Sequence, residues 1–326
     1  MALLEVKNLR VELTTRAGVF PVIDDLSFTL DGGENIAFVG ESGCGKSMTA
    51  LALMGLVPQP VGKISSGQIL LDGEDLTQAT DRRLRQIRGN EISMIFQEPM
   101  TSLNPVYTTG EQIAEVLRRH QGLGKKAAWE QAVELLDAVG IPNPRERAGA
   151  YPHQMSGGQR QRVMIAMALG CRPKVLIADE PTTALDVTVQ AQIFDLLRDL
   201  RRQTDVALIL ITHDMGAVAE MAERMIVMYA GRQAEEGPTE DVIAHPRHPY
   251  TRGLIACVPH LTEHLTDDRP ELVEIPGIVP SLTSFGQDNC LFASRCDLVS
   301  DQCRKARPEL VAFGAQRAAC WHADRV

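Results

Sequence analysis

The sequence predicts an α/β protein with a mixed, mainly parallel sheet, an antiparallel β region before it, a helical region in its middle and a small cysteine-rich domain after it. Short apolar runs alternate with helical patterns, as in parallel strands joined by crossover helices. Residues 3–30 instead alternate apolar and polar positions, as antiparallel strands do. Beyond residue 240, prolines and cysteines become frequent and periodicity is lost. We therefore expect two domains, residues 1–240 and 241–326.

Individual elements can be assigned in chain order. Alternation within 4–6, 11–13 and 26–30 predicts the antiparallel strands, and a further strand pair is expected to flank Gly67 before the turn Asp72-Gly73. Apolar runs predict buried strands at 35–39, 92–96, 174–178 and 206–211, and helical spacing predicts helices within 108–140 and at 189–200.

Length and composition limit the possible functions. The chain has 326 residues, of which 44% are hydrophobic and 23% charged, as is ordinary for a globular protein with a full core. A formal charge of −9 argues against a broad nucleic-acid-binding face. No apolar run approaches the roughly 18 residues of a membrane-spanning helix, and the first residues do not resemble a signal peptide. We therefore expect a cytoplasmic location and no transmembrane segment.

A glycine-rich segment follows the predicted strand at 35–39. It reads Gly40-Glu41-Ser42-Gly43-Cys44-Gly45-Lys46-Ser47 and satisfies G-x-x-x-x-G-K-[ST] at every required position. Helix formers follow from Met48 onward, so the segment joins a strand to a helix. The glycines let backbone N–H groups approach phosphate oxygens, Lys46 can reach the β- and γ-phosphates, and the Ser47 hydroxyl can ligate Mg²⁺. We interpret this segment as a nucleotide phosphate site.

Two acidic residues end the predicted strand at 174–178. Ligands bind at the carboxyl ends of strands in open α/β sheets, so Asp179 is placed to hold Mg²⁺, directly or through water. Glu180 can polarise the water that attacks a γ-phosphate. A solvated acidic strand end is the alternative, and the phosphate loop upstream disfavours it.

Three further sites are ambiguous on local chemistry alone. Ser156 and Gln159 form a capping-box pattern around Gly157 and Gly158, and the exposed N–H groups of such a helix start favour anions, although an ordinary capped helix is the commoner case. His213 follows the strand at 206–211, where it can contact a γ-phosphate or be structural. Gln97 can bind metal or water, or merely end a strand.

Taken in order, these motifs strongly resemble the ATP-binding subunits of ATP-binding-cassette (ABC) transporters, over nearly the whole chain. The SGGQ stretch at 156–159 is the specific mark, since other P-loop families share only the loop and the aspartate. The resemblance implies a P-loop NTPase cassette with antiparallel β and helical subdomains. It also implies a head-to-tail dimer, in which the 156–159 segment of one cassette closes over ATP held by the loop of the other.

The resemblance also implies roles for single residues. Gln97 would contact the metal and couple to the membrane partner, Asp186 of Ala184-Leu185-Asp186 would act across the dimer, and His213 would sense the γ-phosphate beside the catalytic Glu180. The implied nucleotide-contacting residues are Gly40, Ser42, Gly43, Cys44, Gly45, Lys46, Ser47, Met48, Ser156, Gly157, Gly158, Gln159, Asp179 and Asp186. Ser47, Gln97 and Asp179 would surround Mg²⁺. Because these residue types are all intact, we expect a chain competent for hydrolysis.

One departure from the family pattern concerns adenine. A gapless alignment puts Ala17 where such cassettes often stack an aromatic side chain on the base, and Phe20 is a nearby candidate.

Three segments narrow the resemblance to the branch that imports oligopeptides, dipeptides or nickel chelates: FQEPMTSLNP at 96–105, HPYTR at 248–252 and IPGIVPSL at 275–282. This branch implies a peripheral subunit at the cytoplasmic face of the inner membrane. Its partners would be a second cassette (a paralogue or another copy), two membrane permease subunits and, through them, an extracytoplasmic solute-binding protein, without nucleic acid. The alternatives are a soluble ABC ATPase acting on ribosomes or DNA and a metal module that binds ATP without hydrolysing it.

Four of the seven cysteines crowd near the end of the chain. Cys290, Cys296, Cys303 and Cys320 have the spacing C-x₅-C-x₆-C-x₁₆-C, which in a reducing compartment points toward metal rather than free thiols. On chemistry alone, zinc and an iron–sulfur cluster both remain open. The resemblance favours [4Fe–4S], because residues 289–296 are similar to the cluster-bearing tail of peptide-importer ATPases. Cys44 lies in the phosphate loop, and we expect that its thiol can be oxidised or alkylated and that this modification abolishes ATP binding.

Overall fold

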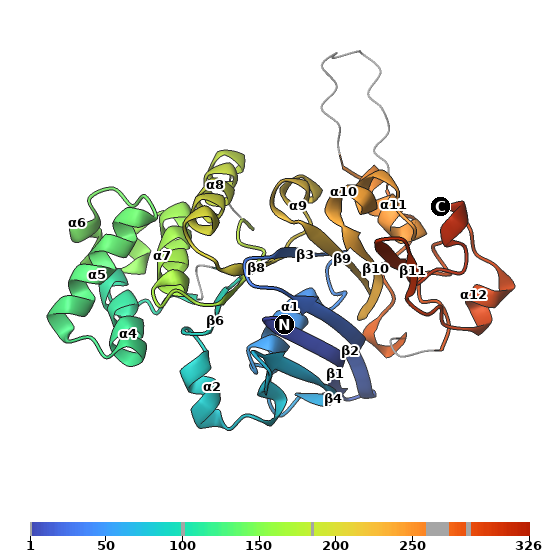
Figure 1. Ribbon diagram of the computed structural model, residues 1–326, viewed down its shortest axis with the longest axis horizontal. Helices are drawn as coiled ribbons and strands as arrows, with labels where there is room; N and C mark the ends of the chain where they lie inside the picture. Colours follow the sequence, from blue (N-terminus) through green and yellow to red (C-terminus); the bar gives the residue numbers. More distant parts are fainter. Residues whose placement is uncertain (1, 99–101, 184–185, 259–273, 285–287) are drawn as a thin grey trace, which may run out of the picture.

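The computed structural model describes residues 2–98, 102–183, 186–258, 274–284 and 288–326. Residues 99–101 of the FQEPMTSLNP segment and residues 184–185 lie outside these ranges. Two sheets lie at the centre of the molecule, helices α4 to α7 lie at one end and the C-terminal region lies at the other (Figure 1).

The first sheet is antiparallel and four-stranded, in the order β2-β1-β4-β5. Its strands are β1 (Leu4–Thr15), β2 (Gly18–Leu30), β4 (Gly62–Leu71) and β5 (Glu74–Asp75). β1 lies in the middle, with Leu4 opposite Leu30 of β2 and Leu71 of β4. The alternation in residues 3–30 therefore predicted the sheet correctly, because one face packs on a core.

The prediction of two strands on either side of Gly67 is wrong, because β4 continues through that residue as one strand. Gly67 has a φ of +91°, and the pairing of β4 with β1 shifts register between Lys7 and Arg10. A Cβ here would lie 2.5 Å from the carbonyl oxygen of Asn8. Gly67 therefore forms a bulge where two backbones meet closely, which a sequence pattern does not distinguish from a turn.

The second sheet has eight strands in the order β11-β12-β10-β9-β3-β8-β7-β6. The five neighbouring strands from β9 to β6 are parallel. Beyond β9, the strands β10, β12 and β11 extend the sheet, and each pairs antiparallel with its neighbour. Every residue of β3, β7 and β8 is buried, as in parallel strands that are covered on both faces. The bounds are β3 (Asn35–Val39), β6 (Ile92–Ile95), β7 (Val175–Asp179), β8 (Ala207–Ile211), β9 (Arg224–Tyr229), β10 (Arg232–Pro238), β11 (Val311–Phe313) and β12 (Gln316–Ala318).

Helices surround the second sheet and build one end of the molecule (Figure 1). The α-helices are α1 (Lys46–Leu53), α2 (Asp81–Ile87), α4 (Thr109–Gln121), α5 (Lys125–Ala138), α6 (Pro144–Ala148), α7 (Gly157–Leu169), α8 (Val187–Gln203), α9 (Met215–Met221), α10 (Thr239–Ala244), α11 (Pro249–Ala256) and α12 (Asp301–Lys305). Short 3₁₀ helices are η1 (Leu76–Gln78), η2 (Pro152–Gln154), η3 (Leu282–Ser284) and η4 (Ala323–Arg325). The predicted helices at 108–140 and 189–200 correspond to α4, α5 and α8.

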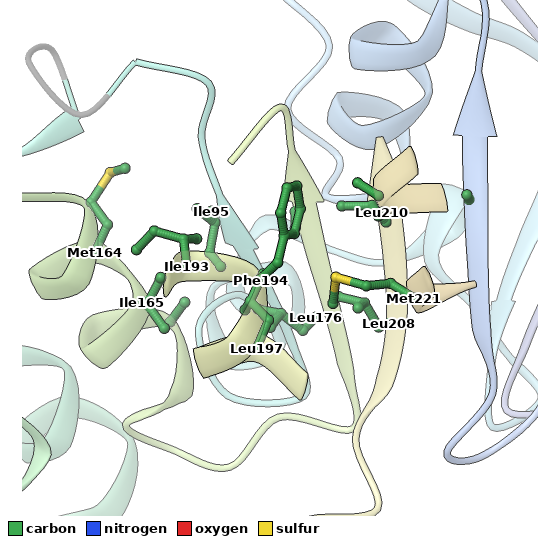
Figure 2. Packing of buried hydrophobic residues seen from close by; sticks show 14 of the residues in the cluster. Ile95, Met164, Ile165, Leu176, Ile193, Phe194, Leu197, Leu208, Leu210 and Met221 are labelled. Atoms are coloured by element: carbon green, nitrogen blue, oxygen red, sulfur yellow. The ribbon is translucent and has the colours of Figure 1, made fainter. Parts of the chain in front are cut away.

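Alternate residues of the central strands face two separate cores. Leu208 and Leu210 of β8 lie in the core that the helices cover, with Phe194 of α8 (Figure 2). Ile209 and Ile211 of the same strand lie in the other core, which the antiparallel sheet covers. The central strands are thus packed from both sides, so their carboxyl ends have fixed positions.

The C-terminal region continues the main sheet, because β12 pairs with β10. The boundary at residue 240 stays a prediction. Within the described ranges, no helix combines the length and apolar character needed to cross a membrane.

Candidate functional site

The predicted phosphate loop, residues 40–47, follows β3 and includes the first two residues of α1. Gly40 and Gly45 have φ values of +146° and +105°, which side chains rarely tolerate. A Cβ on Gly40 would lie 2.3 Å from the carbonyl oxygen of Met228, and one on Gly45 would lie 2.9 Å from that of Val22. Both conformation and packing therefore require glycine. As the residue before α1, Gly45 also leaves the first N–H groups of that helix without a side-chain cap, as an anion site needs.

The ammonium group of Lys46 is buried inside this loop. It donates hydrogen bonds of 2.6 Å to the carbonyl oxygen of Gly40 and 3.1 Å to that of Glu41. These bonds offset the cost of taking a strongly hydrated charge out of water. Lys46 is therefore held against the backbone that a phosphate would contact.

Ser47 and Asp179 meet beside the loop. The hydroxyl of Ser47 donates a 3.0 Å hydrogen bond to Oδ1 of Asp179, which ends β7. Burial raises the pKa of Asp179 to about 6; the Glu180 carboxylate adds to the rise, and the Ser47 hydroxyl and the Lys46 ammonium oppose it. A bound cation would favour the charged form of such a carboxyl, and a carboxylate beside a hydroxyl supplies the oxygen ligands that Mg²⁺ prefers. These residues fit a magnesium ion.

Side chains from the ends of three adjacent strands meet at Glu180. Gln97, after β6, donates a 2.8 Å hydrogen bond from Nε2 to Oε2 of Glu180. His213, after β8, has Nδ1 3.7 Å from Oε1 of the same carboxylate and is largely exposed. Glu180 itself has a φ of +45°, and its N–H donates to the carbonyl oxygen of Ile211. The structure thus brings together the three residues predicted to be catalytic.

Thr183 was missed by sequence reasoning, although it lies close to these residues. Its hydroxyl donates a 2.8 Å hydrogen bond to Oε2 of Glu180, the same oxygen that Gln97 contacts. A threonine four residues after the end of β7 belongs to no motif that we recognised, so the sequence carried no signal for it. The predicted adenine partner stays untested: Ala17 is exposed between β1 and β2, and Phe20 lies on β2.

The capping box at the start of α7 forms as predicted. Ser156 Oγ accepts from the N–H of Gln159, and Gln159 Oε1 accepts from the N–H of Ser156. A Cβ on Gly158 would lie 2.8 Å from Cγ1 of Val189 on α8, so close helix packing requires this glycine. Asp186 lies directly before α8, and its Oδ1 accepts a hydrogen bond from the N–H of Val189. Within the described ranges, no hydrogen bond or ion pair joins residues 156–159 to residues 40–47 of the same chain.

The four C-terminal cysteines line one pocket together with His248, Phe292 and His322. Burial raises the pKa of Cys290 and of Cys320 to about 11, and the neighbouring cysteines add to the rise. Within the described part of the chain, no group of three or more His, Cys, Asp or Glu side chains is placed to hold a metal ion. The structure therefore gathers these thiols without showing an arrangement for a single ion.

Cys44 does not fit the expectation that it is open to alkylation. Its side chain is fully buried, and burial raises the pKa of its thiol. A reagent would need access and a thiolate, and both are restricted here.

The site combines a phosphate-binding loop, the Ser47–Asp179 pair that fits Mg²⁺ and the oriented carboxylate of Glu180. This combination defines a P-loop nucleotide hydrolase. Two family models match the sequence. Residues 23–183 match the model described as ABC transporter, and residues 234–303 match the one described as oligopeptide/dipeptide transporter, C-terminal region.

Similar proteins agree with both matches. The dipeptide transport ATP-binding protein DppD of Bacillus subtilis is 48% identical over 323 residues, which cover 99% of this chain and 95% of that protein. The oligopeptide transport ATP-binding protein OppD of Haemophilus influenzae is 49% identical over 320 residues, covering 98% and 97%. A solved dimeric ATP-binding cassette in a post-hydrolysis state, bound to ADP and phosphate, has a TM-score of 0.65 and 27% identity, covering 72% of this chain and 98% of that chain.

The chain therefore belongs to the ATP-binding subunits of ABC transporters, in the branch that carries the oligopeptide/dipeptide transporter C-terminal region. It is an ATPase, and its fold is that of an ABC cassette.

Proposed function

We propose that this chain hydrolyses MgATP at the interface of a cassette dimer and thereby drives the import of peptides or a peptide-like solute. One observation supports the proposed hydrolysis most directly. Gln97, Glu180 and His213 lie together at the ends of adjacent strands, beside the Ser47–Asp179 pair. Peptides are the proposed cargo because the matched C-terminal region and the named relatives are those of dipeptide and oligopeptide transporters.

Each of these residues has a chemical role in the proposal. The N–H groups of the loop and Lys46 would bind the β- and γ-phosphates. Ser47 and Asp179, with Gln97, would hold Mg²⁺, and the ion would supply positive charge to neutralise the phosphates. Glu180, fixed by Gln97 and Thr183, orients the attacking water and accepts its proton. His213 is exposed at the neighbouring strand end and donates to the γ-phosphate.

A dimer completes the site in this proposal. Ser156 and Gly157 are exposed at the N-terminus of α7, where N–H groups favour an anion. In Figure 1, α7 lies apart from α1 within one chain. In this proposal the segment that covers the loop therefore comes from a partner chain. The similar cassette solved as a dimer supports this arrangement. Asp186, exposed at the start of α8, would act across the same interface.

The proposed assembly contains a second cassette, two membrane permease subunits and a solute-binding protein, with this chain at the cytoplasmic face of the inner membrane. The test is to purify the tagged full-length chain from membranes of its source cells, identify its partners and reconstitute the complex in vesicles. Uptake of labelled di- and oligopeptides should require ATP and be lost when Lys46 is changed to Ala. Co-purification with ribosomes or DNA instead of permeases would favour the soluble alternative.

We further propose that residues 241–326 form a separate small domain whose four cysteines hold a [4Fe–4S] cluster. Support comes from the pocket that all four thiols line together. The cluster would supply an iron–sulfur centre, and the cysteines would hold it as thiolates.

This second proposal is tested on full-length protein purified without oxygen. A brown colour with visible charge-transfer absorption and about four iron atoms per chain is expected. The change Cys303→Ser should remove the colour, whereas Cys257→Ser, outside the pocket, should keep it. Colourless protein with one zinc per chain would establish the zinc alternative, and metal-free protein would overturn both.

A further inference from the structure

The C-terminal region reaches the phosphate loop through two side chains that sequence reasoning did not connect with it. Both contact Glu41, the second residue of the loop. Arg295 binds the Glu41 side chain and Tyr250 binds its backbone, from positions 254 and 209 residues further along the chain. Direct side-chain bonds therefore link the two regions.

The contact between Arg295 and Glu41 is a bidentate ion pair. One guanidinium nitrogen lies 2.7 Å from Oε2 of Glu41 and the other lies 2.9 Å from Oε1. The Arg295 side chain is only 3% exposed, against 29% for Glu41. Two parallel charge-assisted bonds fix an orientation as well as a distance. Glu41 is thus held in one position at the mouth of the loop.

Arg295 is itself held from several directions. Nε donates to the carbonyl oxygen of Pro276 over 2.8 Å, and the guanidinium lies over the rings of Tyr229 and Phe292 at 5.9 and 5.8 Å from their centres. Pairing with Glu41 also raises the pKa of Arg295, so the side chain stays charged. The guanidinium is therefore set in place independently of nucleotide.

Tyr250 fixes the backbone of the same residue. Its hydroxyl oxygen accepts a 2.7 Å hydrogen bond from the N–H of Glu41, and its ring is fully buried against Tyr229 and Phe292. The carbonyl oxygens of Gly40 and Glu41 are those that the ammonium of Lys46 contacts. Holding Glu41 therefore also holds the carbonyls that position the phosphate-binding lysine.

We propose that Arg295 and Tyr250 are positioning residues of the ATP site, through which the C-terminal region sets the conformation and charge of the phosphate loop. The inference rests on the proposed nucleotide site of the same loop. Arg295 neutralises a carboxylate that would otherwise stand unpaired beside a triphosphate, and Tyr250 fixes the adjoining backbone. Nucleotide affinity therefore depends on the region that follows the cassette.

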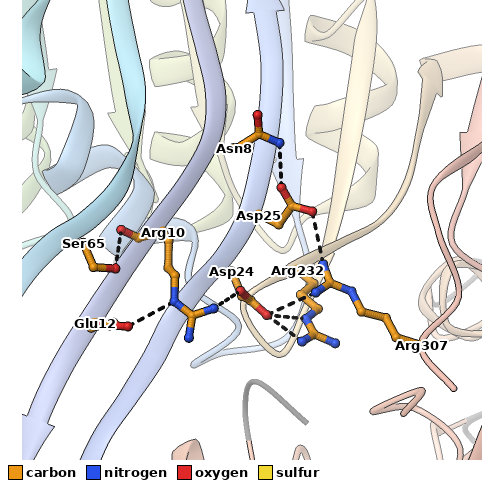
Figure 3. A network of polar contacts seen from close by, with 8 residues as sticks. All are labelled: Asn8, Arg10, Glu12, Asp24, Asp25, Ser65, Arg232 and Arg307. Carbon is orange, nitrogen blue, oxygen red and sulfur yellow. Dashed lines mark hydrogen bonds and ion pairs between the residues drawn. The ribbon is translucent and has the colours of Figure 1, made fainter. Parts of the chain in front are cut away.

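Other contacts keep the C-terminal region docked when Arg295 is replaced. Asp24 of β2 accepts bonds from Arg10 and Arg232 and lies 3.4 Å from Arg307 of the C-terminal region (Figure 3). Arg307 also lies 3.4 Å from Asp25, and β12 stays paired with β10. Loss of the Arg295 pair alone should therefore leave the region in place.

The test measures MgATP affinity by titration calorimetry on the full-length chain, with thermal unfolding as a check of folding. Arg295→Met should weaken MgATP binding about tenfold, since it leaves the Glu41 carboxylate unpaired near the phosphates. Adding Glu41→Gln to Arg295→Met should restore most of the affinity, because the repelling charge is then gone. A merely structural role of Arg295 would not be rescued by removing that charge.

Arg252→Met is the matched control, because it breaks an exposed pair with Asp297 in the same region, far less buried than Arg295. It should bind MgATP like the wild type. Equal affinities of the Arg295→Met and Arg252→Met chains, or no recovery in the double variant, would overturn the proposal. Tyr250→Phe keeps the ring and removes only the acceptor, so it should weaken binding severalfold even if Arg295→Met does not fold. Wild-type affinity of the Tyr250→Phe chain would overturn the role of Tyr250.

Lys46→Ala separates this inference from the function on which it rests. If Lys46→Ala binds MgATP as tightly as the wild type, the proposed nucleotide site itself is wrong. If Lys46→Ala weakens binding and Arg295→Met does not, the nucleotide site stands and only the positioning role fails.

Discussion

Gln97 Nε2 donates a 2.8 Å hydrogen bond to Oε2 of Glu180, and this bond joins the ends of β6 and β7. Thr183 donates to the same oxygen. The other oxygen, Oε1, faces His213 at 3.7 Å. One half of the carboxylate is thus anchored by two donors, which leaves Oε1 to orient a water. Preorganisation of this kind suits a step that needs a positioned acceptor more than a strong base.

Changing Glu180 to Gln keeps the shape of the side chain and removes its charge. Turnover of ATP in the assembled complex should fall by about 100-fold or more, because a general base typically contributes at least that factor to the rate. The affinity for MgATP should stay within about threefold of the wild type. The ATP-bound dimer should then persist, as size-exclusion chromatography would show. Glu220→Gln, which breaks an exposed pair with Arg198, is the control and should hydrolyse normally. Undiminished hydrolysis by Glu180→Gln would refute the assigned role.

Changing Lys46 to Ala removes the buried ammonium from the loop. MgATP affinity should drop by about tenfold or more, because the β- and γ-phosphates lose their nearest positive charge. Calorimetric titration gives the dissociation constant directly. Lys174→Ala is the matched control, since Lys174 forms an exposed pair with Asp72 instead. If Lys46→Ala binds MgATP as tightly as Lys174→Ala and the wild type, the nucleotide site proposed at this loop is wrong.

Cys44 should resist alkylation in the folded chain. Its burial denies access to the reagent and raises the pKa of the thiol, so little thiolate forms at neutral pH. After treatment with iodoacetamide, mass spectrometry should find Cys44 unmodified and Cys257, which is half-buried, labelled. MgATP binding should survive the treatment. Equal labelling of the two cysteines would show that the loop opens readily.

Acid should weaken the packing around His248. Burial lowers the pKa of this histidine from 6.5 to about 4, and its neutral Nδ1 accepts the N–H of Tyr250. Between pH 6.5 and pH 4, His248 is therefore mostly protonated in the unfolded chain and mostly neutral in the folded chain. The stability that the neutral ring contributes is complete above pH 6.5 and is lost as the pH falls toward 4.

The size of this effect can be measured by urea unfolding at pH 7 and pH 5. Protonation of His248 in the unfolded chain should lower the free energy of unfolding by about 2 kcal/mol between these two values. His248→Asn keeps a capping acceptor for α11 but does not titrate. Between pH 7 and pH 5, the free energy of unfolding of this variant should therefore fall by about 2 kcal/mol less than that of the wild type. Buried Glu235, which accepts the N–H of His248, is common to both chains and cancels in the comparison. Equal losses in both chains would exclude His248 as the source.

Much of the site was predictable because its signals are local. The loop at 40–47, the carboxylates that end β7 and the capping box of α7 each lie within a few consecutive residues. The resemblance implied that Gln97, Glu180 and His213 serve one site, and the structure brings them together because adjacent parallel strands end at one edge of the sheet. Gly67 was placed wrongly because its conformation depends on the backbone of a different strand.

The sequence by itself determined the α/β class, the phosphate loop and the chemical identity of the site, since spacing within a segment carries that information. Only the tertiary structure decided that Thr183 anchors Glu180, that Cys44 is sealed inside the loop and that Arg295 and Tyr250 hold Glu41. These contacts join residues by packing rather than by pattern. Their partners are chosen by how the strands and the C-terminal region dock, and no periodicity along the chain records that choice.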